Sequence, residues 1–338
     1  CHRSFQQGMA IRIFVPVLNI AFVGSENLAR SIAKKGDVRD IESYVFKEER
    51  NGVTQIISLL RPLKHPEKIR PLLSVLNVAK VGIIEVSKVD ASLGEICVSF
   101  GCAGIKKGLI IINPESGGWV DPEQVKMIIH QSGLKDWDLF ETVPDEHEIR
   151  EKLFSLMEYT KGNEGSLIIP VDQHFNVKGV GLVAIGYVQS GSVSKHDTIQ
   201  VLPAEENGIV RSLQVMDDDV EIAVSGDRVG LAIRNLREET LHRGCMVTHL
   251  DSGALIKNTE STFEINKAPF QKRELEVGDI IHAAVDMQFV VGRITNKEKS
   301  IVTVDWEVPL WTRLERSPPV IISQLDAMPM RIIGTTVF

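Results

Sequence analysis

The chain has 338 residues, a formal net charge of −7 and a hydrophobic content of 43%. This length exceeds what one hydrophobic core usually organises, so two or three domains are expected. Because no apolar run reaches the roughly 18 to 20 residues of a membrane-spanning helix, a protein that crosses a membrane in this way is excluded. The acidic balance excludes a protein that holds nucleic acid by overall charge. No DNA partner is expected, and an RNA partner would need a local basic face.

The chain contains four cysteines, which is typical of a protein from a reducing compartment. We therefore expect a cytoplasmic protein without a disulfide scaffold. Cys97 and Cys102 lack the CxxC spacing of a metal site, so buried packing is expected for them and no metal site is predicted. Residues 1–8 are assigned no role.

Residues 1–160 alternate apolar runs with helix-like stretches, which is typical of a parallel α/β domain. Helices are expected around Ile69–Leu76, at Ser92–Phe100 and at Pro122–Ser132. In the first of these, Pro71 falls in the opening turn, where its missing N–H costs little. Strands are expected at Leu18–Val23, Val53–Leu60, Val81–Val86 and Gly108–Asn113.

The pattern changes after residue 163, where short alternating runs separated by Gly, Asn and Asp replace the helical phasing. This pattern is typical of small antiparallel β-barrels. One barrel is expected at 164–251 and a second at 258–338, with a hinge over Asp251–Asn258. The predicted fold class is therefore a multidomain one, in which a parallel α/β domain precedes two antiparallel β-barrels.

The glycine-rich run IIPVDQHFNVKGVGLVAIGYVQSG, from Ile168 to Gly191, is the most informative part of the sequence. It resembles the start of the second domain of elongation factor Tu-like proteins, and it looks most similar to the selenocysteine-specific factor and its archaeal relatives. The alternative interpretation of this run is an unrelated small barrel with glycine turns, because glycine permits tight bends and positive φ in any such barrel. Further similar segments follow in the family's order, at Val210–Gln214, Ser225–Ala232, Arg243–Gly244 and Pro329–Gly334.

The resemblance implies a GTPase-like first domain, with a phosphate loop G-x-x-x-x-G-K-[ST] after the first strand. Gly24–Ser31 falls on this frame, and Gly24 and Ser31 match it. Ala29 replaces the second glycine, and Arg30 replaces the lysine. Arginine keeps the charge but not the compact ammonium group that reaches the outer phosphates. The loop is therefore interpreted as a degenerate P-loop.

Two further elements of the family's nucleotide site are also altered. The D-x-x-G motif and the histidine after it, which hold Mg²⁺ and sense the γ-phosphate, correspond by position to Arg61–His65, where the carboxylate and the glycine are missing. His65 is a weak candidate for the family's water-orienting histidine, and an exposed loop histidine is the expectation. The guanine-reading N-K-x-D keeps only Asn113. The candidate nucleotide-binding residues are Gly24, Arg30, Ser31 and Asn113, and GTP with Mg²⁺ stays an open cofactor assignment.

The leading hypothesis is a translation factor homologue that binds aminoacyl-tRNA or the ribosome, with lost or weakened GTP binding and hydrolysis. In the family, the aminoacyl end rests in a pocket on the second domain. Carried over by position, this pocket would be lined by Asp172, Gln173, Phe175, Gln214 and Arg228. Phe175 would stack on a terminal base and Arg228 would contact phosphate or carbonyl groups. The alternative is that Phe175 is barrel core and Arg228 a surface partner of Asp227.

Two other hypotheses stay open. The first is an active translational GTPase with an unorthodox site, which the matches at Gly24, Ser31, His65 and Asn113 favour and the missing carboxylates oppose. The second is a protein-interaction scaffold. Because three nucleotide motifs are altered together, the chain looks most similar to an archaeal elongation-factor-like group with degenerate motifs.

Overall fold

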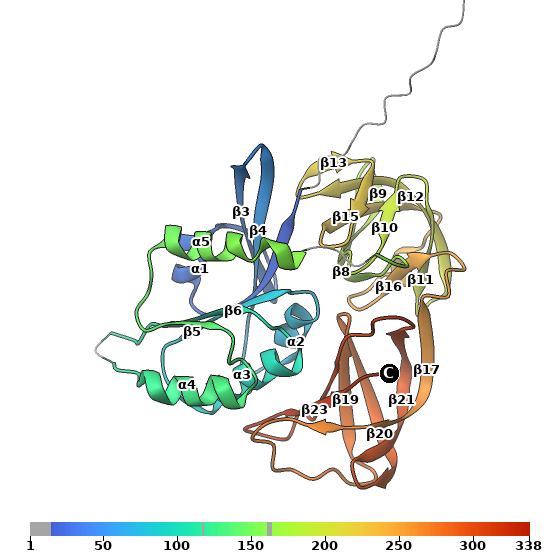
Figure 1. Cartoon of the computed structure of the whole chain (residues 1–338). Helices are drawn as coiled ribbons and strands as arrows, with labels where there is room; N and C mark the ends of the chain where they lie inside the picture. Colours follow the sequence, from blue (N-terminus) through green and yellow to red (C-terminus); the bar gives the residue numbers. More distant parts are fainter. Residues whose placement is uncertain (1–14, 117, 161–163) are drawn as a thin grey trace, which may run out of the picture.

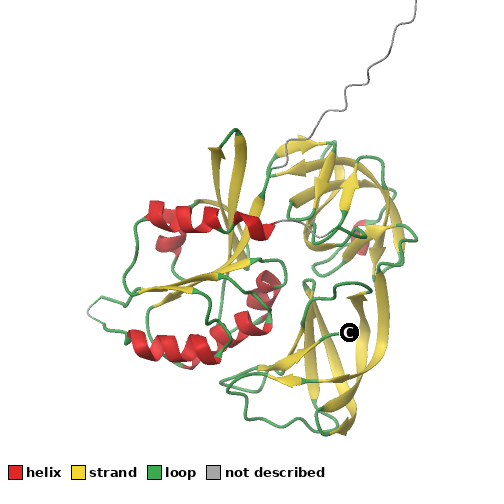
Figure 2. Cartoon of the chain, in the orientation of Figure 1, coloured by secondary structure: helices red, strands yellow, loops and turns green. Residues whose placement is uncertain are grey.

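The computed structural model describes residues 15–116, 118–160 and 164–338, so residues 1–8 lie outside the described part. An α/β part is followed by two parts built from strands, and helices are concentrated in the first (Figures 1 and 2). This arrangement confirms the predicted fold class. None of the described helices is long and apolar enough to cross a membrane.

The α/β part is built on a seven-stranded mixed sheet with the order β2-β3-β4-β1-β5-β6-β7. β2 (Lys34–Val38) and β3 (Ile41–Arg50) form an antiparallel hairpin at one edge, and β3 pairs with β4. The parallel strands are β1 (Val17–Val23), β4 (Val53–Pro62), β5 (Val81–Val86), β6 (Gly108–Ile112) and β7 (Asp138–Phe140).

Helices cover both faces of this sheet. The helices α1 (Glu26–Ile32) and α5 (Glu146–Ser155) pack on one face, and α2 (Arg70–Leu76), α3 (Ala91–Cys102) and α4 (Pro122–Gln131) pack on the other. Side chains alternate between the faces of a strand. Accordingly Ile20 and Phe22 belong to the core on the α1 and α5 side, whereas Ala21 belongs to the opposite core. A 3-10 helix, Met157–Thr160, follows α5.

The second part is a closed antiparallel barrel with its own apolar interior. Two short strands, β10 (Ser192–Ser194) and β14 (Ile222–Val224), pair beside it, and β13 (Asp218–Val220) extends the sheet from β12. The ladder runs in the order β8 (Ile169–Val177), β9 (Gly181–Tyr187), β15 (Arg228–Arg234), β12 (Glu206–Val215), β11 (Thr198–Leu202) and β16 (Met246–His249), and then returns to β8.

The third part is a curled antiparallel sheet. The strand β17 (Leu255–Glu264) lies at one end and pairs with β21, whereas its continuation β18 (Asn266–Lys267) pairs with β23 at the other end. The sheet therefore folds back on itself through one continuous stretch of chain. Residues 255–258, which were expected in the hinge, begin β17 instead. The remaining strands are β19 (Ile280–Val285), β20 (Gln288–Glu298), β21 (Ile301–Arg313), β22 (Val320–Ser323) and β23 (Ile332–Thr336).

The three parts meet at a shared junction. The core beside α2 and α3 continues without a break to Tyr187 of the barrel and to Met287, Ile321 and Ile332 of the third part, all of which are buried. Polar contacts reinforce this junction, for example the hydrogen bond of 3.0 Å from the Met287 N–H to the Asn77 side-chain oxygen. These contacts set the positions of the sites described below.

Candidate functional site

The turn between β1 and α1 is much shorter than the expected phosphate loop. Only Gly24 and Ser25 separate the two elements, because the Ser25 hydroxyl caps the helix by accepting a hydrogen bond of 3.2 Å from the Leu28 N–H. A serine N-cap followed by Glu26 is a strong helix start. The frame from Glu26 to Ser31 is therefore helix, and Ala29 is a fully buried helix residue, which corrects the expectation that it belongs to the loop.

Arg30 and Ser31 make contacts within this helix. The Arg30 guanidinium, which is exposed, donates to the Glu26 carboxylate one turn earlier at 2.7 Å. The Ser31 hydroxyl donates to the Leu28 carbonyl at 2.8 Å. Both side chains thus lie on α1 with partners within the helix, and their role in nucleotide binding stays a prediction.

Gly24 and Asn113 are brought together, and a carboxylate lies between them. Glu85 projects from β5, and its two oxygens accept hydrogen bonds from the Ser25 N–H and, at 2.5 Å, from the Asn113 side chain. The approach to Gly24 is so close that an added Cβ there would lie 2.7 Å from Glu85. The backbone N–H that a bound phosphate would use is therefore already bonded to an anion of the chain itself.

Cations at this site are likewise paired with carboxylates of the chain. Arg61 stands where the metal-binding aspartate was expected, and it bonds the Gly24 carbonyl and the Glu42 carboxylate, each at 2.7 Å. Lys35 bridges Glu42 and Glu26 at 2.6 and 2.8 Å. Burial favours a raised pKa for Glu42, but hydrogen bonds from Lys35, Tyr44 and Arg61 lower it below the usual range. The network is internally neutralised.

His65 is not the exposed loop histidine that was expected. Its side chain is only 6% exposed, and its Nε2 lies 3.0 Å from the Glu95 carboxylate of α3. Glu95 is in turn paired with Arg331 of the third part. His65 thus belongs to a contact between the first and third parts, away from the contacts of Glu85.

The predicted RNA-binding residues lie on the outer face of the barrel. Gln173 on β8 is aligned through Ile185 and Gly230 with Gln214 on β12, so both side chains project from the same face. Phe175 is half-buried and lies outside the barrel's apolar core, which removes the barrel-core alternative for it. Arg228 is aligned with Tyr187 on β9, also on this face.

The α/β part covers one end of this face. Arg243 bonds both Asp172 and Asp40, with nitrogen-to-oxygen distances of 2.9 Å to each. The Gln173 side chain donates to Asp37 at 2.8 Å. Asp172 and Gln173 are consequently buried against the α/β part, whereas Gln214 at the other end is exposed. The structure divides the predicted pocket into a covered end and an open end.

Comparison with known proteins gives a consistent result. Residues 181–248 match the family described as Elongation factor Tu domain 2. The uncharacterized protein MJ0325 of Methanocaldococcus jannaschii is 31% identical over 285 residues, which cover 84% of this chain and 88% of that protein. The selenocysteine-specific elongation factor of the same organism is 34% identical over 144 residues, covering 40% of this chain and 30% of that factor. This chain belongs to the elongation factor Tu-like family.

Solved structures of elongation factor Tu-like proteins share the whole fold. The translation elongation factor SelB from Methanococcus maripaludis, in complex with the GTP analogue GppNHp, superposes with a TM-score of 0.77 at 21% identity, over 96% of this chain and 79% of that chain. The bacterial selenocysteine-specific factor EF-Sec superposes with a TM-score of 0.78 at 17% identity, and this chain spans 58% of its length. The SelB-like translation factor fold is therefore established for this chain.

Two residues that organise the site of this elongation factor Tu-like chain were missed by sequence reasoning. The signal for Glu85 was present, because it is the one acidic residue in the apolar strand VGIIEV. Arg243 has no sequence signal beyond its resemblance to the family, and its partner Asp40 lies 203 residues away in sequence. A pairing of that separation has no local signature.

Proposed function

We propose that this chain is a translation factor homologue that binds an aminoacylated tRNA end or the ribosome, and that it has lost or weakened GTP binding and hydrolysis. The observation that carries the nucleotide part of the proposal is the Glu85 carboxylate bonded to the Ser25 N–H and to Asn113. A translational role would place the protein in the cytoplasm.

The residues present do not fit GTP with Mg²⁺. A phosphate would meet the negative charge of Glu85 at the turn after β1, and no lysine follows on the frame. Mg²⁺ requires oxygen ligands, yet the positively charged Arg61 stands at the position of the metal-binding aspartate. Asn113, the remnant of the guanine-reading motif, already bonds Glu85. No nucleotide-dependent step is therefore derived for this chain.

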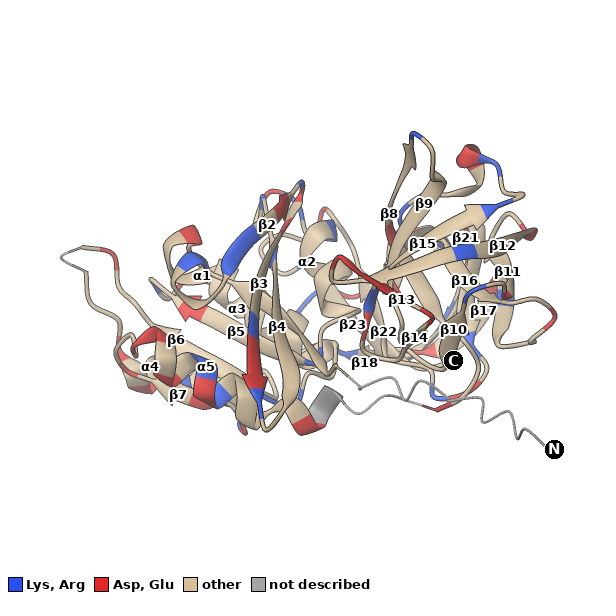
Figure 3. Ribbon diagram, turned by 90° about the horizontal axis from the view of Figure 1, so that it is seen from above, with Lys and Arg blue, Asp and Glu red and all other residues tan. Residues whose placement is uncertain are grey.

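The open end of the barrel face supports the RNA part of the proposal. Single-stranded RNA ends are recognised by aromatic side chains that stack on bases and by polar groups that bond base edges and phosphates. Phe175 and Gln214 provide an aromatic ring and an amide on this face, whereas Arg228 lies on the same face beside the buried Tyr187. Acidic and basic residues are interspersed over the molecule (Figure 3), so local contacts of this kind, and not a broad basic surface, would hold the RNA.

Titration of the full chain with a fluorescent GTP analogue, with and without Mg²⁺, tests the nucleotide part. We expect no saturable Mg²⁺-dependent signal, with SelB from Methanococcus maripaludis as the positive control. The Glu85→Ala variant is expected to show at most weak binding that does not depend on Mg²⁺, because Arg61 remains. Tight Mg²⁺-dependent binding by the unmodified chain would show that it is an active GTPase with an unorthodox site.

Crosslinking in cells followed by RNA sequencing tests the RNA part. Enrichment of tRNA 3′ ends or of ribosomal RNA is expected, with crosslinks mapping to β8, β12 and β15. Copurification with proteins and without RNA would instead favour the scaffold hypothesis. The two tests are independent, so either half of the proposal can fail alone.

A further inference from the structure

A small cavity lies where the three parts of the chain meet. It has a volume of about 200 Å³, and it is lined from the first part by Asn77, Lys80 and the 103–105 turn, from the barrel by Gln189 and from the third part by Arg313 and Arg316. A water molecule takes up roughly 30 Å³ of liquid. The space is therefore large enough for a small ion together with water molecules.

The charged groups in this lining are all cations. Lys80, Arg313 and Arg316 contribute positive charge, and the described residues that line the cavity include no Asp or Glu. Among these three and within the described part of the chain, Arg313 alone forms an ion pair: a buried two-bond pair with Asp286, one bond of which measures 2.8 Å. Three cations therefore line one cavity of a chain whose net charge is −7.

Lys80 is a half-buried ammonium group with weak compensation. Its hydrogen bond within the described structure runs to the Gln189 side-chain oxygen at a long 3.4 Å. Burial lowers the pKa of Lys80, Arg313 lowers it further, and Asp286 only opposes this effect. Holding a cation in such a place costs free energy unless an anion approaches it.

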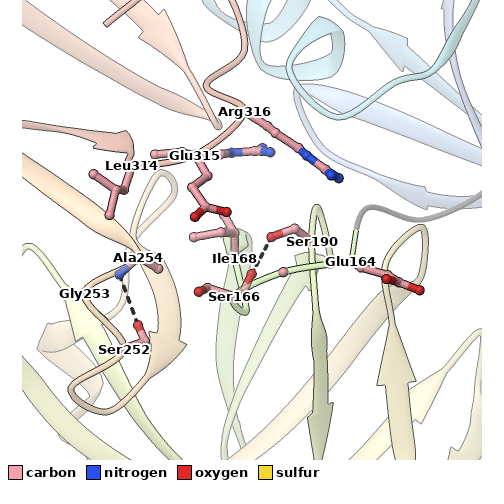
Figure 4. Close-up of a pocket in the computed structure, with 12 residues that line it drawn as sticks. Glu164, Ser166, Ile168, Ser190, Ser252, Gly253, Ala254, Leu314, Glu315 and Arg316 are labelled. Carbon is pink, nitrogen blue, oxygen red and sulfur yellow. Dashed lines mark hydrogen bonds between the residues drawn. The ribbon is translucent and has the colours of Figure 1, made fainter.

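Arg316 brings a second cation to the cavity from the third part, and the described residues give it no ion pair. It adopts a positive φ of 51°, which is uncommon for a residue other than glycine. Figure 4 shows the adjoining cavity, in which Arg316 extends away from the carboxylate of the neighbouring Glu315. Glu315 and Glu164 line that second cavity and not the first. Arg316 thus lines both cavities, and no ion pair of its guanidinium is found among the described residues.

The neutral polar groups of the cavity also favour an anion. The Asn77 side-chain oxygen accepts from the Met287 N–H, and the Gln189 side-chain oxygen accepts from Lys80. Because the oxygens are used in this way, the NH₂ groups of both amides remain as donors. A cavity rich in donors and lined by cations is suited to an oxyanion.

We propose that this junction is a binding site for a small free oxyanion of the phosphate class, held by Lys80 and Arg316 with help from Asn77 and Gln189. Such an anion would contact all three parts of the chain at once and would stabilise their arrangement. The lining comes from three separate parts of the chain that meet at one point, which favours a compact free ion over an extended RNA backbone. The proposal does not depend on the function proposed above.

The test measures the melting temperature of the full chain as chloride is replaced by inorganic phosphate at constant ionic strength. A ligand that binds the folded state raises the melting temperature in a saturable way. We expect this rise for the unmodified chain, with at least tenfold weaker binding in Lys80→Met and in Arg316→Ala. Lys135→Met, which removes an exposed lysine elsewhere in the first part, should respond like the unmodified chain.

Lys80→Met should also have a higher melting temperature than the unmodified chain when phosphate is absent. The reason is that the substitution replaces a poorly compensated, half-buried charge with an apolar side chain of similar length. If phosphate raised the melting temperature equally in every variant, the rise would reflect general exclusion of phosphate from protein surfaces, and the proposed site would be overturned. The proposal would also be overturned if phosphate did not change the melting temperature of the unmodified chain. A parallel arm uses a 5′-phosphorylated RNA trinucleotide. A response to this RNA alone, lost in Lys80→Met and Arg316→Ala, would overturn the assignment to a free ion.

Discussion

The carboxylate of Glu95 accepts hydrogen bonds from both the backbone N–H and the side-chain Nε of Arg331, at 2.8 and 2.9 Å, across 236 residues of sequence. Both side chains are almost completely buried, and His65 completes the cluster. The ion pair joins α3 of the α/β part to the start of β23. It therefore ties the first part of the chain to the third.

Arg331→Met is expected to destabilise the chain by about 3–5 kcal/mol, because it leaves the Glu95 charge buried without its partner. Denaturant unfolding of the purified variant measures this loss. Arg237→Met, which breaks the exposed ion pair with Glu206, is the matched control and should cost less than about 1 kcal/mol. Equal losses of unfolding free energy in the two variants would show that the buried Glu95–Arg331 pair contributes no more to stability than the exposed Arg237–Glu206 pair.

The same pair predicts a dependence of stability on pH. Burial favours a raised pKa for Glu95, but hydrogen bonds from Arg331 and His65 outweigh it and lower the pKa from 4.5 to about 2. A carboxyl whose pKa is lower in the folded state stabilises above the unfolded value, and the stabilisation is lost as pH falls toward the folded value. A contribution on the order of 3 kcal/mol should therefore disappear between pH 4.5 and 2. Unfolding curves of Glu95→Gln should lack this part of the decline.

Gly82 on β5 leaves room for two aromatic rings. An added Cβ would lie 2.1 Å from Trp137 and 2.5 Å from Phe100, which pack edge to face in the core. Gly82→Ala is expected to cost about 3 kcal/mol or more, the upper range for overpacking. Gly94→Ala, inside α3 with open space around it, should instead stabilise by about 0.5–1 kcal/mol. Thermal unfolding of both variants distinguishes crowding from a general intolerance of alanine.

The sequence predicted those elements whose apolar runs are long enough to be buried on their own. Val81–Val86 was predicted with its observed bounds, and α4 was predicted to within one residue. The hairpin of β2 and β3 was missed because charged residues fill much of it, as in the segment KEER that ends β3. β3 is stabilised by pairing with β4, and β2 by pairing with β3, and such pairing leaves no periodic apolar signal.

The candidate site was predictable in its position and not in its chemistry. Gly24 follows β1 and Asn113 follows β6, the strands on either side of β5 in the parallel sheet, so both residues could be expected at the same edge of the sheet. The early start of α1 depends on the Ser25 cap, and the closure of the turn depends on a carboxylate from β5. Neither contact is local enough to appear as a motif. The frame G-x-x-x-x-G-K-[ST] therefore suggested a loop where the chain forms helix.

Phe175→Ala is expected to weaken binding of a single-stranded CCA RNA end, on the proposal that Phe175 stacks on a base. Stacking contributes about 1–3 kcal/mol per base, which corresponds to a loss of roughly 5- to 150-fold in affinity. Fluorescence anisotropy with a labelled oligonucleotide measures it. Phe270→Ala, which removes a phenylalanine 45% exposed in the third part, is the control and should leave the affinity unchanged. Unchanged affinity in Phe175→Ala would remove Phe175 from the RNA-binding face.

Arg243 determines how much of that face is covered. Its guanidinium joins Asp172 of the barrel to Asp40 of the α/β part, so Arg243→Ala leaves two carboxylates facing each other without a cation. We expect a loss of about 1–3 kcal/mol of stability and faster hydrogen exchange at residues 37–40 and 172–175.

Exchange in β11, two strands from β8 in the barrel ladder, should not change in Arg243→Ala, because its pairing with β12 and β16 does not involve Arg243. Lys257→Ala, which breaks the exposed pair between the second and third parts, serves as the control and should leave residues 37–40 protected. If Arg243→Ala exchanged like the unmodified chain, the Asp37–Gln173 hydrogen bond and the apolar junction would be sufficient to hold the α/β part on the barrel. The covered end of the face would then be a fixed surface and not one that can open for RNA.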